Sequence, residues 1–568
     1  MEGFWKREPF FFNSFPFIVR FFPAIFFTFI IFSCSDETKP EPDPLTITSL
    51  KIDGVEKFGS TDMRNISRTA SFEITFSAPI DPNFATTEFI DISGNELFVY
   101  TLSNNDKTVT LTSTQPLQHL FRYLFWVSLD VKGKKGETLS NQYSQYFHTV
   151  LDPTPKKALL PNDEDNDTDN TNDLLSVVQQ QTFKYFYDFA HPTSGMARER
   201  NSSGNTVTSG GSGFGIMALI VGMERGFITR ADGLTRMDKI LDFLETADRF
   251  HGVWPHWMNG NTGDVIPFSA NDNGGDLVET SFLVQGLLTF RQYLNAGVAE
   301  ENLLINRINV LWHGVEWDWY RRCEPTCQNV LYWHWSPDKN WAMNFAMYGY
   351  FEEQITYFLA AASPTHPIPK IVYSNGYGKN GAIVKNNTYE GITLPLESPA
   401  PLFWVQYSYL GLDPHFTDDY ANYWTQNVNA SRINQKYCIR NPKNFVGYSD
   451  ECWGLTSSDN QNGYGAHSPN NDLGVITPTA ALSSFPYTPT ESMKALKFFY
   501  YTMGDRLWGP YGFYDAFNPT QNWYASSYLA IDQGPIVVMI ENYRTGLLWD
   551  LFMSAPEVQT AKNELDFN

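Results

Sequence analysis

The sequence predicts two folded parts of different class, an N-terminal β-sandwich and a much larger all-α domain. From about Thr46 to Val150, apolar and polar residues alternate with the period of a half-buried strand. From Leu174 onward, apolar residues recur every three or four positions, as they do on one face of a helix. The chain has 568 residues. Since a typical domain has roughly 100–200 residues, there is room for both parts.

The composition narrows the class of ligand. The net charge is −22, so the acidic surface repels phosphate backbones, and we expect no nucleic acid partner. Aromatic residues make up 16% of the chain and charged residues only 18%, which excludes disorder, coiled coil and collagen. An acidic chain rich in Trp and Tyr suits neutral, hydroxylated ligands that stack on rings.

Residues 1–33 read as a signal peptide. Basic residues precede an apolar run, Phe21–Phe32, that is too short to span a bilayer, which needs about 20 residues. The segment Ile30–Cys34 resembles a bacterial lipoprotein signal, in which cleavage leaves a lipidated cysteine. We therefore expect lipidation at Cys34 and a lipoprotein of the outer membrane or cell surface, facing the periplasm or the outside. The alternative is a plain secretory signal with an incidental cysteine.

The β-sandwich is expected over residues 46–150, after a Pro-rich tether at 34–45. Phe72, Ile74 and Phe76 are separated by polar residues, and turn residues divide the alternating runs. The stretch resembles the bacterial Ig-like modules found ahead of secreted enzymes. It shows no convincing site, so a spacer role is the default interpretation.

Residues 151–173 form the predicted linker, which ends in an acidic, polar stretch. Its aspartates alternate like the start of a calcium loop, but Thr168 stands where such a loop has Gly, and Leu174 stands where it has Glu. We interpret the stretch as solvated linker.

The all-α domain is expected over residues 174–568. Its predicted helices lie near 174–190, 211–225, 303–321, 341–362, 490–503 and 535–552, with further ones around Leu241 and Leu287. Long Gly-, Asn-, Trp- and Pro-rich loops such as 252–275 and 504–534 separate them, and loops of that length usually carry function. The pattern favours a barrel of stacked helical hairpins, although helix pairs alone do not separate a barrel from a superhelical repeat.

Four cysteines follow the signal: Cys323, Cys327, Cys438 and Cys452. An even number in an exported protein permits two disulfides. No His lies at ligand spacing from either pair, so we expect structural thiols or disulfides and no metal.

The most informative segment for chemistry is Asn271–Thr280. Two glycines break the chain before a helix, which would bring Asp272, Asp276 and Glu279 together near a helix N-terminus that favours negative charge. Asp276 followed three residues later by Glu279 is also a capping-box pattern. Capping alone does not explain Asp272, the double glycine or the nearby Trp254, His256 and Trp257.

Two further acidic positions complete the candidate site. Glu352 precedes Glu353 in a run rich in aromatic residues, where apolar surroundings raise the pKa of a carboxyl toward that of a general acid. Asp532 stands where a loop enters a helix, a position at which Asp also serves as an N-cap. The sequence has no GxSxG, P-loop or HExxH motif, so the remaining chemistry is that of paired carboxylates and rings, as in glycoside hydrolysis.

Several ordered motifs resemble the bacterial glucoamylase-like domain, typified by the endo-β-1,2-glucanases of glycoside hydrolase family 144. They are 271–279, 362–367, 451–459, 508–515 and 531–535, and the resemblance runs from about 174 to 560. It implies an (α/α)6 barrel that hydrolyses β-1,2-glucan with inversion and without a metal or cofactor. The family's acidic trio maps onto Asp272, Asp276 and Glu279. By analogy with a related family, Glu352 would be the acid and Asp532 the base.

The sequence therefore predicts a monomeric, exported glycosidase bound to the membrane only through its anchor. Its substrate would be a β-glucan oligo- or polysaccharide. The rival classes are a non-catalytic surface glycan-binding lipoprotein and a glucanase of the same fold acting on another linkage. The predicted substrate-binding residues are Trp254, His256, Trp257, Trp341, Trp404, Trp453 and Tyr511.

Overall fold

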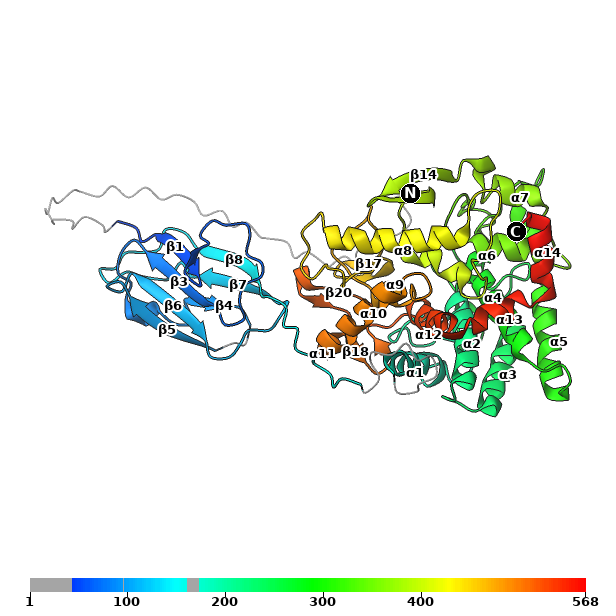
Figure 1. Cartoon of the computed structure of the whole chain (residues 1–568), viewed down its shortest axis with the longest axis horizontal. Coiled ribbons are helices and arrows are strands. Elements are labelled where there is room, and N and C mark those ends of the chain that lie inside the picture. Colours follow the sequence, from blue (N-terminus) through cyan, green and yellow to red (C-terminus); the bar gives the residue numbers. More distant parts are fainter. Residues whose placement is uncertain (1–42, 95–96, 161–172) are drawn as a thin grey trace, which may run out of the picture. The chain divides into compact units, whose positions relative to one another are not determined.

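The computed structural model describes residues 43–94, 97–160 and 173–568. The chain divides into two compact units between Leu151 and Asp152 (Figure 1). The predicted signal peptide, Cys34 and most of the acidic linker lie outside the described residues. In the part of the chain that is described, no helix combines the length and the apolar character needed to cross a bilayer.

The first unit is a β-sandwich, which confirms the predicted class. One antiparallel sheet has the strand order β2-β1-β3-β6-β5, and the other has the order β4-β7-β8. The strands are β1 (Ile47–Ile52), β2 (Val55–Glu56), β3 (Ser71–Phe76), β4 (Ile90–Ile92), β5 (Phe98–Ser103), β6 (Thr108–Ser113), β7 (Arg122–Val127) and β8 (Tyr143–His148).

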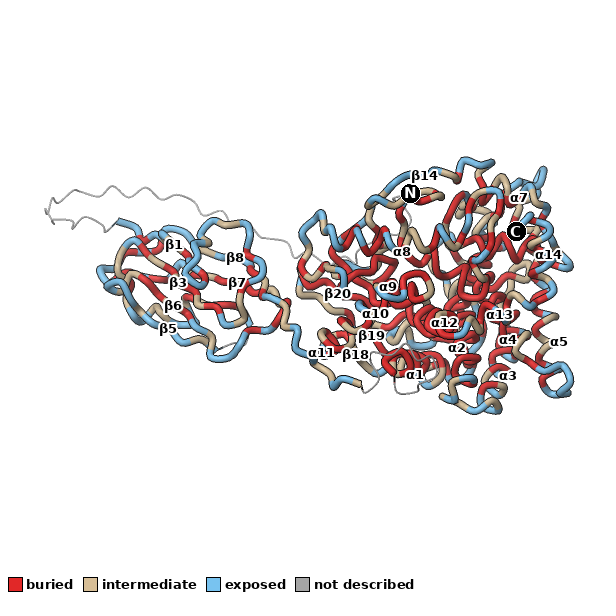
Figure 2. The backbone as a smooth tube through the Cα atoms, viewed as in Figure 1, coloured by how far each residue is buried: buried red, intermediate tan, exposed pale blue. Residues whose placement is uncertain are grey.

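The core of this unit comes from the inward residues of the alternating strands. Burial alternates strictly along β3 and β7, as the sequence period requires. The Phe72 ring of one sheet meets Phe125 and Phe147 of the other, with ring centroids 6.1 Å and 5.0 Å apart. The two sheets thus share a single apolar core, visible as the buried interior of the unit (Figure 2).

The second unit is built on a closed ring of inner helical elements, each packed on the next. The ring runs α2, α4, α6, the 3-10 turns η4 and η5, α9 and α12, and α12 closes on α2. Their bounds are α2 (Ser209–Glu224), α4 (Leu277–Tyr293), α6 (Gln354–Ala362), η4 (Leu402–Val405), η5 (Tyr407–Tyr409), α9 (Pro478–Leu482) and α12 (Ala530–Thr545). Every residue of α2 from Ser209 to Met223 is buried, as expected of a helix that is apolar all round.

Outer helices alternate with the inner elements along the chain, so the unit is a barrel of six outer–inner pairs. This arrangement is the predicted (α/α)6 architecture. The outer helices are α1 (Leu174–Tyr187), α3 (Arg230–Thr246), α5 (Ala299–His313), α7 (Lys370–Asn375), α8 (Tyr423–Arg440) and α10 (Pro489–Lys497), and α11 (Gly504–Leu507), α13 (Leu547–Met553) and α14 (Pro556–Leu565) supplement them.

Short strands lie in the connections between the helices. Those before α4 are β9 (Thr206–Thr208), β10 (Trp257–Asn259), β11 (Val265–Ile266) and β12 (Gly275–Asp276), which pairs with β13 (His334–Trp335). The later hairpins are β14 (Val384–Tyr389) with β15 (Ile392–Leu396), β16 (Ser457–Asn460) with β17 (Gly463–Ala466), β18 (Trp508–Gly509) with β19 (Gly512–Phe513), and β20 (Phe517–Asn518) with β21 (Trp523–Tyr524).

Glycines allow α2 and α4 to approach closely. A Cβ on Gly213 would lie 2.2 Å from the Phe282 carbonyl oxygen, and one on Gly286 would lie 2.2 Å from the Gly213 carbonyl oxygen. Both contacts are with backbone, which cannot rotate away. The close crossing of these two helices therefore depends on glycine at both positions.

The predicted helix over 341–362 is wrong in its first half, because only Gln354–Ala362 is helical. Asn344 and Gly349 adopt positive φ values of 47° and 94°, which a right-handed helix does not accommodate. Two other predicted helices are divided in the structure. The helix predicted over 303–321 ends at His313, before the 3-10 turn η2 (Trp317–Arg321). The helix predicted over 535–552 breaks at Gly546, whose φ is 75°.

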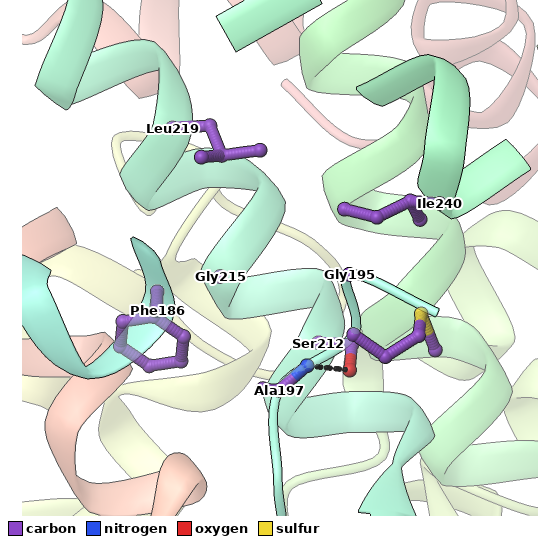
Figure 3. A pocket seen from close by; sticks show the side chains of 8 residues that line it. Phe186, Gly195, Ala197, Ser212, Gly215, Leu219 and Ile240 are labelled. Atoms are coloured by element: carbon purple, nitrogen blue, oxygen red, sulfur yellow. Dashed lines mark hydrogen bonds between the residues drawn. The ribbon is translucent and has the colours of Figure 1, made fainter. Parts of the chain in front are cut away.

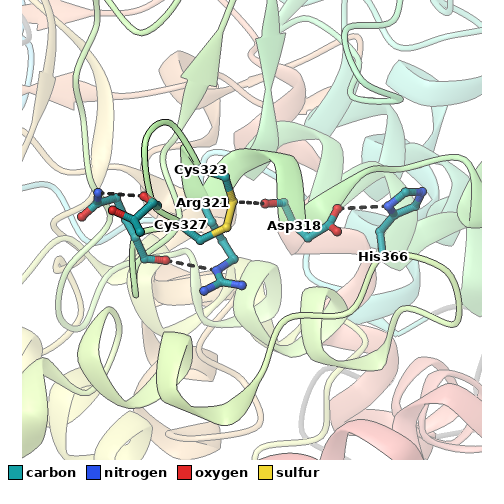
Figure 4. Close-up of a disulfide and its surroundings, with 7 residues drawn as sticks. Asp318, Arg321, Cys323, Cys327 and His366 are labelled. Atoms are coloured by element: carbon teal, nitrogen blue, oxygen red, sulfur yellow. Dashed lines mark hydrogen bonds and ion pairs between the residues drawn. A yellow bond between two sulfur atoms is a disulfide. The ribbon is translucent and has the colours of Figure 1, made fainter.

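Cys323 and Cys327 form a disulfide, whereas Cys438 and Cys452 are buried free thiols. The disulfide closes the small loop after η2 (Figure 4). Nearby, the Asp318 carboxylate lies 3.0 Å from His366 Nδ1, and Arg321 donates to the Gln328 carbonyl over 3.1 Å.

Candidate active site

The candidate site lies where the inner helices begin. The Gly210 amide, in the first turn of α2, donates to the Glu279 carboxylate in the first turn of α4 over 2.8 Å. Thr479, near the start of α9, donates its hydroxyl to the Asp532 carbonyl in α12 over 2.7 Å. The inner helices thus present their N-termini at one end of the barrel, and N-termini stabilise negative charge.

Asp276 caps helix α4 and also contacts other residues of the candidate site. One carboxylate oxygen accepts from the amides of Val278 and Glu279 over 3.0 Å and 2.9 Å, which makes Asp276 the N-cap of α4. The other oxygen lies 3.1 Å from His256 Nδ1 and accepts from Trp333 Nε1 over 2.9 Å. The Glu279 side chain is bound to α2 and does not cap in return. The capping box is therefore only half formed. The capping role of Asp276 is confirmed, and its role toward a ligand stays a prediction.

His256 is a cation among these carboxylates. Its ring stacks on Phe268 with centroids 4.3 Å apart, and its Nε2 lies 3.9 Å from Glu279 Oε1. Burial alone would lower its pKa, but Glu279, Asp276 and Asp272 together raise the pKa of His256 to about 10. At neutral pH the imidazole is therefore protonated.

Asp272 is 3% exposed and lies close to both His256 and Asp276, with ligand atoms of the three residues within 4.8 Å of one another. Burial, and then the charge of Asp276, raises the pKa of Asp272 to about 7. His334, which the sequence analysis missed, accepts the amides of Asn273 and Gly274 at Nε2 over 3.1 Å and 2.9 Å and fixes the loop that carries Asp272. The β12–β13 pairing that aligns His334 with Asp276 is a long-range contact, which no local signal announces.

Among the described residues, His256, Asp272 and Asp276 are the group that could share a metal ion, since their ligand atoms lie within 4.8 Å of one another. The His256 imidazole, however, already pairs with Asp276 and Glu279 as a cation. A metal ligand must give up that proton. A metal ion bound here would therefore have to displace the His256 proton.

Glu352 stands in the turn directly before α6, half-buried. Burial, followed by the charges of Glu279 and Asp276, raises the pKa of Glu352 to about 8, so it is protonated at neutral pH. Its neighbour Glu353 is 1% exposed, and its carboxyl oxygens have no hydrogen-bond partner among the described residues. Burial holds the pKa of Glu353 well above its ordinary value. Glu352 is therefore the member of the pair that a ligand can reach.

Asp532 lies in the first turn of α12 and is 1% exposed. It is not the N-cap, which is Leu529. Burial, and then the charge of Asp515, holds the pKa of Asp532 well above its ordinary value. Asp515 and its neighbour Asp459 were missed as site residues, although each ends a segment that carries the family resemblance, 508–515 and 451–459.

Tyr407, in η5, is buried, and its hydroxyl has no hydrogen-bond partner among the described residues. Burial, followed by Asp532, Tyr464, Glu352 and Glu279, raises the pKa of Tyr407 well above its ordinary value. The charges of Asp532 and Glu352 therefore both influence this buried hydroxyl.

Four of the predicted ring residues are partly exposed: Trp257, Trp341, Trp404 and Tyr511. The Trp404 ring packs on Phe351, next to Glu352, with centroids 4.3 Å apart. The Trp257 ring meets Phe268 edge-on at 4.8 Å, beside His256. These rings stay candidates for binding a sugar.

Trp254 and Trp453 were predicted to bind substrate, but both side chains are fully buried. Trp254 donates to the Leu244 carbonyl over 3.2 Å, and the Arg249 guanidinium lies 4.2 Å from its ring centroid. Trp453 donates to the Glu491 carbonyl over 3.3 Å. Neither ring has a free face for a ligand, so both belong to the core.

A small cavity lies apart from this site, among residues of α1, α2 and α3 (Figure 3). Its volume is about 10 Å³, room for no more than a water molecule. Ser212 accepts the Ala197 amide over 2.9 Å at its edge, and Phe186 and Ile240 supply apolar walls. It is a packing defect and cannot hold a sugar.

Comparison with known proteins agrees with this architecture. Residues 344–556 match the glycoamylase family model, described as "Putative glucoamylase", and residues 58–149 match the bacterial Ig-like domain. An endo-β-1,2-glucanase from Chitinophaga pinensis, solved with sophorotriose and glucose, is 57% identical. It covers 70% of this chain and 98% of its own, with a TM-score of 0.68.

Two relatives come from Parabacteroides distasonis. A solved β-1,2-glucanase is 37% identical and covers 93% of this chain and 74% of its own, with a TM-score of 0.67. An exo β-1,2-glucooligosaccharide sophorohydrolase (non-reducing end) is 48% identical over 410 residues, which is 68% of this chain. The match spans only 57% of that relative's length. The chain belongs to the bacterial glucoamylase-like family that includes β-1,2-glucanases, and it carries a bacterial Ig-like domain ahead of the family domain.

Proposed function

We propose that this protein is an exported glycoside hydrolase that cleaves β-1,2-glucan or sophoro-oligosaccharides with inversion of the anomeric centre. One observation carries the proposal: Glu352, protonated at neutral pH, and Asp532 both lie where inner helices begin, at the end of the barrel that holds the acidic trio. A protonated carboxyl and a second carboxyl group across a cleft are what inverting hydrolysis needs. The names of the relatives support the β-1,2 linkage.

In the proposed reaction, the Glu352 carboxyl gives its proton to the leaving glycosidic oxygen. A water molecule attacks the anomeric carbon from the opposite face, and its proton passes toward Asp532. Asp272, Asp276 and Glu279 bind sugar hydroxyls, and the partly exposed rings of Trp257, Trp341, Trp404 and Tyr511 stack on the glucan. His256 offsets the charge of the three carboxylates, which would otherwise repel one another.

The proposal includes the place of action. Lipidation of Cys34 would hold the protein at the outer membrane or cell surface as a monomer, with no membrane contact besides the anchor. The disulfide Cys323–Cys327 suits an exported chain, because disulfides persist in oxidising compartments.

The test is digestion of a panel of linear β-1,2-, β-1,3-, β-1,4- and α-glucans, with reducing ends counted and the anomer of the fresh product read by NMR. We expect α-configured product from β-1,2-glucan only. Glu352→Gln and Asp532→Asn should each lower kcat by roughly 10²–10⁴-fold.

The matched control is Asp472→Asn, which removes a buried carboxylate that binds Tyr448 and the Gly474 amide outside the site. It should leave kcat unchanged. Binding of β-1,2-glucan without any new reducing ends would overturn the proposal in favour of a glycan-binding lipoprotein.

A further inference from the structure

Asp532 belongs to a group of described residues in which acidic side chains outnumber cations. The partly exposed Glu199 and Asp459 bind the guanidinium of Arg200, and the buried Asp515 and Asp532 lie beyond Asp459. One guanidinium cannot neutralise all four carboxylates. The group must therefore hold protons at neutral pH.

The guanidinium of Arg200 already pairs with two of these carboxylates, those of Glu199 and Asp459. Its Nη1 lies 3.1 Å from both carboxylate oxygens of Asp459, and its Nε lies 2.9 Å and 3.0 Å from those of Glu199. Ser527 donates a further hydrogen bond to Asp459 over 2.6 Å. Asp459 is thereby the carboxylate bound by both Arg200 and Ser527, and its backbone amide donates to Asp515 Oδ2 over 2.7 Å.

Asp515 and Asp532 have no cation of their own. Their side chains are hydrogen-bonded to each other, and they are 2% and 1% exposed. Asp515 Oδ1 and both carboxyl oxygens of Asp532 receive no hydrogen bond from any other protein donor among the described residues. Two carboxyl groups in contact, shielded from water, cannot both be ionised, so a proton lies between them.

We propose that Asp515 and Asp532 share one proton and act together as the base, so that the pair, and not Asp532 alone, takes up the proton of the attacking water. This inference rests on the proposed function. Asp515 acts through Asp532 and is a positioning residue in that sense. The pair interacts electrostatically with the buried Tyr407 and the partly exposed Tyr464, and Asp459 with Arg200 are the charged groups that act on it.

The proton balance is simple. At rest the pair holds one proton and one negative charge. In the reaction the bond between the anomeric carbon and the leaving oxygen breaks, Glu352 protonates that oxygen, and water oxygen bonds to the carbon. The water's proton brings the pair to two protons and no charge. Release of that proton to solvent and reprotonation of Glu352 restore the resting state.

The test is the pH profile of kcat/KM for Asp515→Asn. Asn keeps the acceptor for the Asp459 amide but cannot share a proton, and an amide is a weaker donor to the Asp532 anion than a carboxylic acid is. The pKa of Asp532 for its first ionisation therefore rises, and we expect the acid limb to move up by at least about 0.5 pH unit. We also expect kcat to fall roughly 10-fold or more, with little change in KM.

A shift of the acid limb to lower pH would indicate a different arrangement, in which the two carboxyl groups share no proton. If Asp515 were simply an ionised neighbour, removal of its charge would ease the ionisation of Asp532 and move the acid limb to lower pH. A downward shift, or no shift, overturns the proposal. Asp515→Glu, which keeps a carboxyl, should retain the wild-type acid limb, and Asp515→Ser should repeat the upward shift if the Asn variant does not fold. A wild-type protein inactive on every glucan would instead refute the proposed function.

Discussion

His256 places a positive charge among carboxylates that would otherwise repel one another. Its pairing with Asp276 and Glu279 keeps it protonated far above the ordinary range of histidine. The same charge acts on Glu352, whose pKa it lowers. The pH at which the proposed acid loses its proton therefore depends on His256.

Replacement of His256 by Gln should move the alkaline limb of kcat/KM to higher pH. Glu352 must be protonated to act, and its activity is lost as the pH rises through its pKa, about 8 in the intact protein. Without the imidazolium, that pKa rises further. A pH series on a soluble sophoro-oligosaccharide measures the limb.

The control for this series is His366→Gln, which removes a histidine paired with Asp318 in a partly exposed position. Its profile should match the wild type. A His256→Gln profile that keeps the wild-type alkaline limb would contradict the electrostatic role.

The sequence identified the type of the site residues better than their surroundings. The carboxylates Asp272, Asp276 and Glu279 stand out because their spacing around two glycines is local. Trp254 looks like a loop aromatic in the sequence, yet it is buried against Arg249. Asp515 acquires its significance only through Asp532, and contacts between distant segments leave no local pattern.

The α2–α4 crossing holds the acidic trio in place. Glu279 is bound to the first turn of α2 through the Gly210 amide, so a shift between the helices would separate donor and acceptor. Gly213 and Gly286 make the close approach possible. The geometry of the site thus depends on the glycines beneath it.

Gly213→Ala should lower the free energy of unfolding by about 1–3 kcal/mol, because its Cβ would overlap the backbone of α4. It should also reduce kcat, since relief of the overlap displaces Glu279. Urea denaturation and steady-state kinetics measure the two effects.

Gly297→Ala is the matched control. Its Cβ meets nothing closer than the Asn295 side chain at 3.2 Å, and we expect a change within about 0.5 kcal/mol. Equal stability of the two variants would show that α2 and α4 can separate without cost.

The sequence predicted helices well where apolar periodicity was long, as in α2 and α4, and poorly before α6. The aromatic residues of 341–353 suggested a continuous helix, but Asn344 and Gly349 turn the backbone into the left-handed region. Periodicity reports which side chains are apolar. It does not report where a loop must turn to bring Glu352 to the mouth of the barrel.

Each of the two units has its own core. The apolar cluster of the β-sandwich is formed from residues between Leu45 and Phe147, with no member from the barrel. The Chitinophaga relative matches 70% of this chain and nearly all of its own. The barrel is therefore expected to fold without the sandwich.

A chain that begins at Asp152 should keep kcat on short sophoro-oligosaccharides within about twofold and lose one calorimetric transition. Calorimetry and reducing-end assays on both chains test this. A fall of tenfold or more in kcat would mean that the sandwich contributes to the site.

The position of the carboxylates at helix starts separates two kinds of evolutionary change. The proposed acid, Asp532 of the proposed base pair, and Asp276 and Glu279 of the trio lie at the starts of inner helices. Hairpins and loops such as β16–β17 and the disulfide-closed segment after η2 lie in the connections between helices. Relatives named for endo and for exo action share this frame at 57% and 48% identity. Because the connections are separate from the helix starts, an exchange of loops would leave these carboxylates in place.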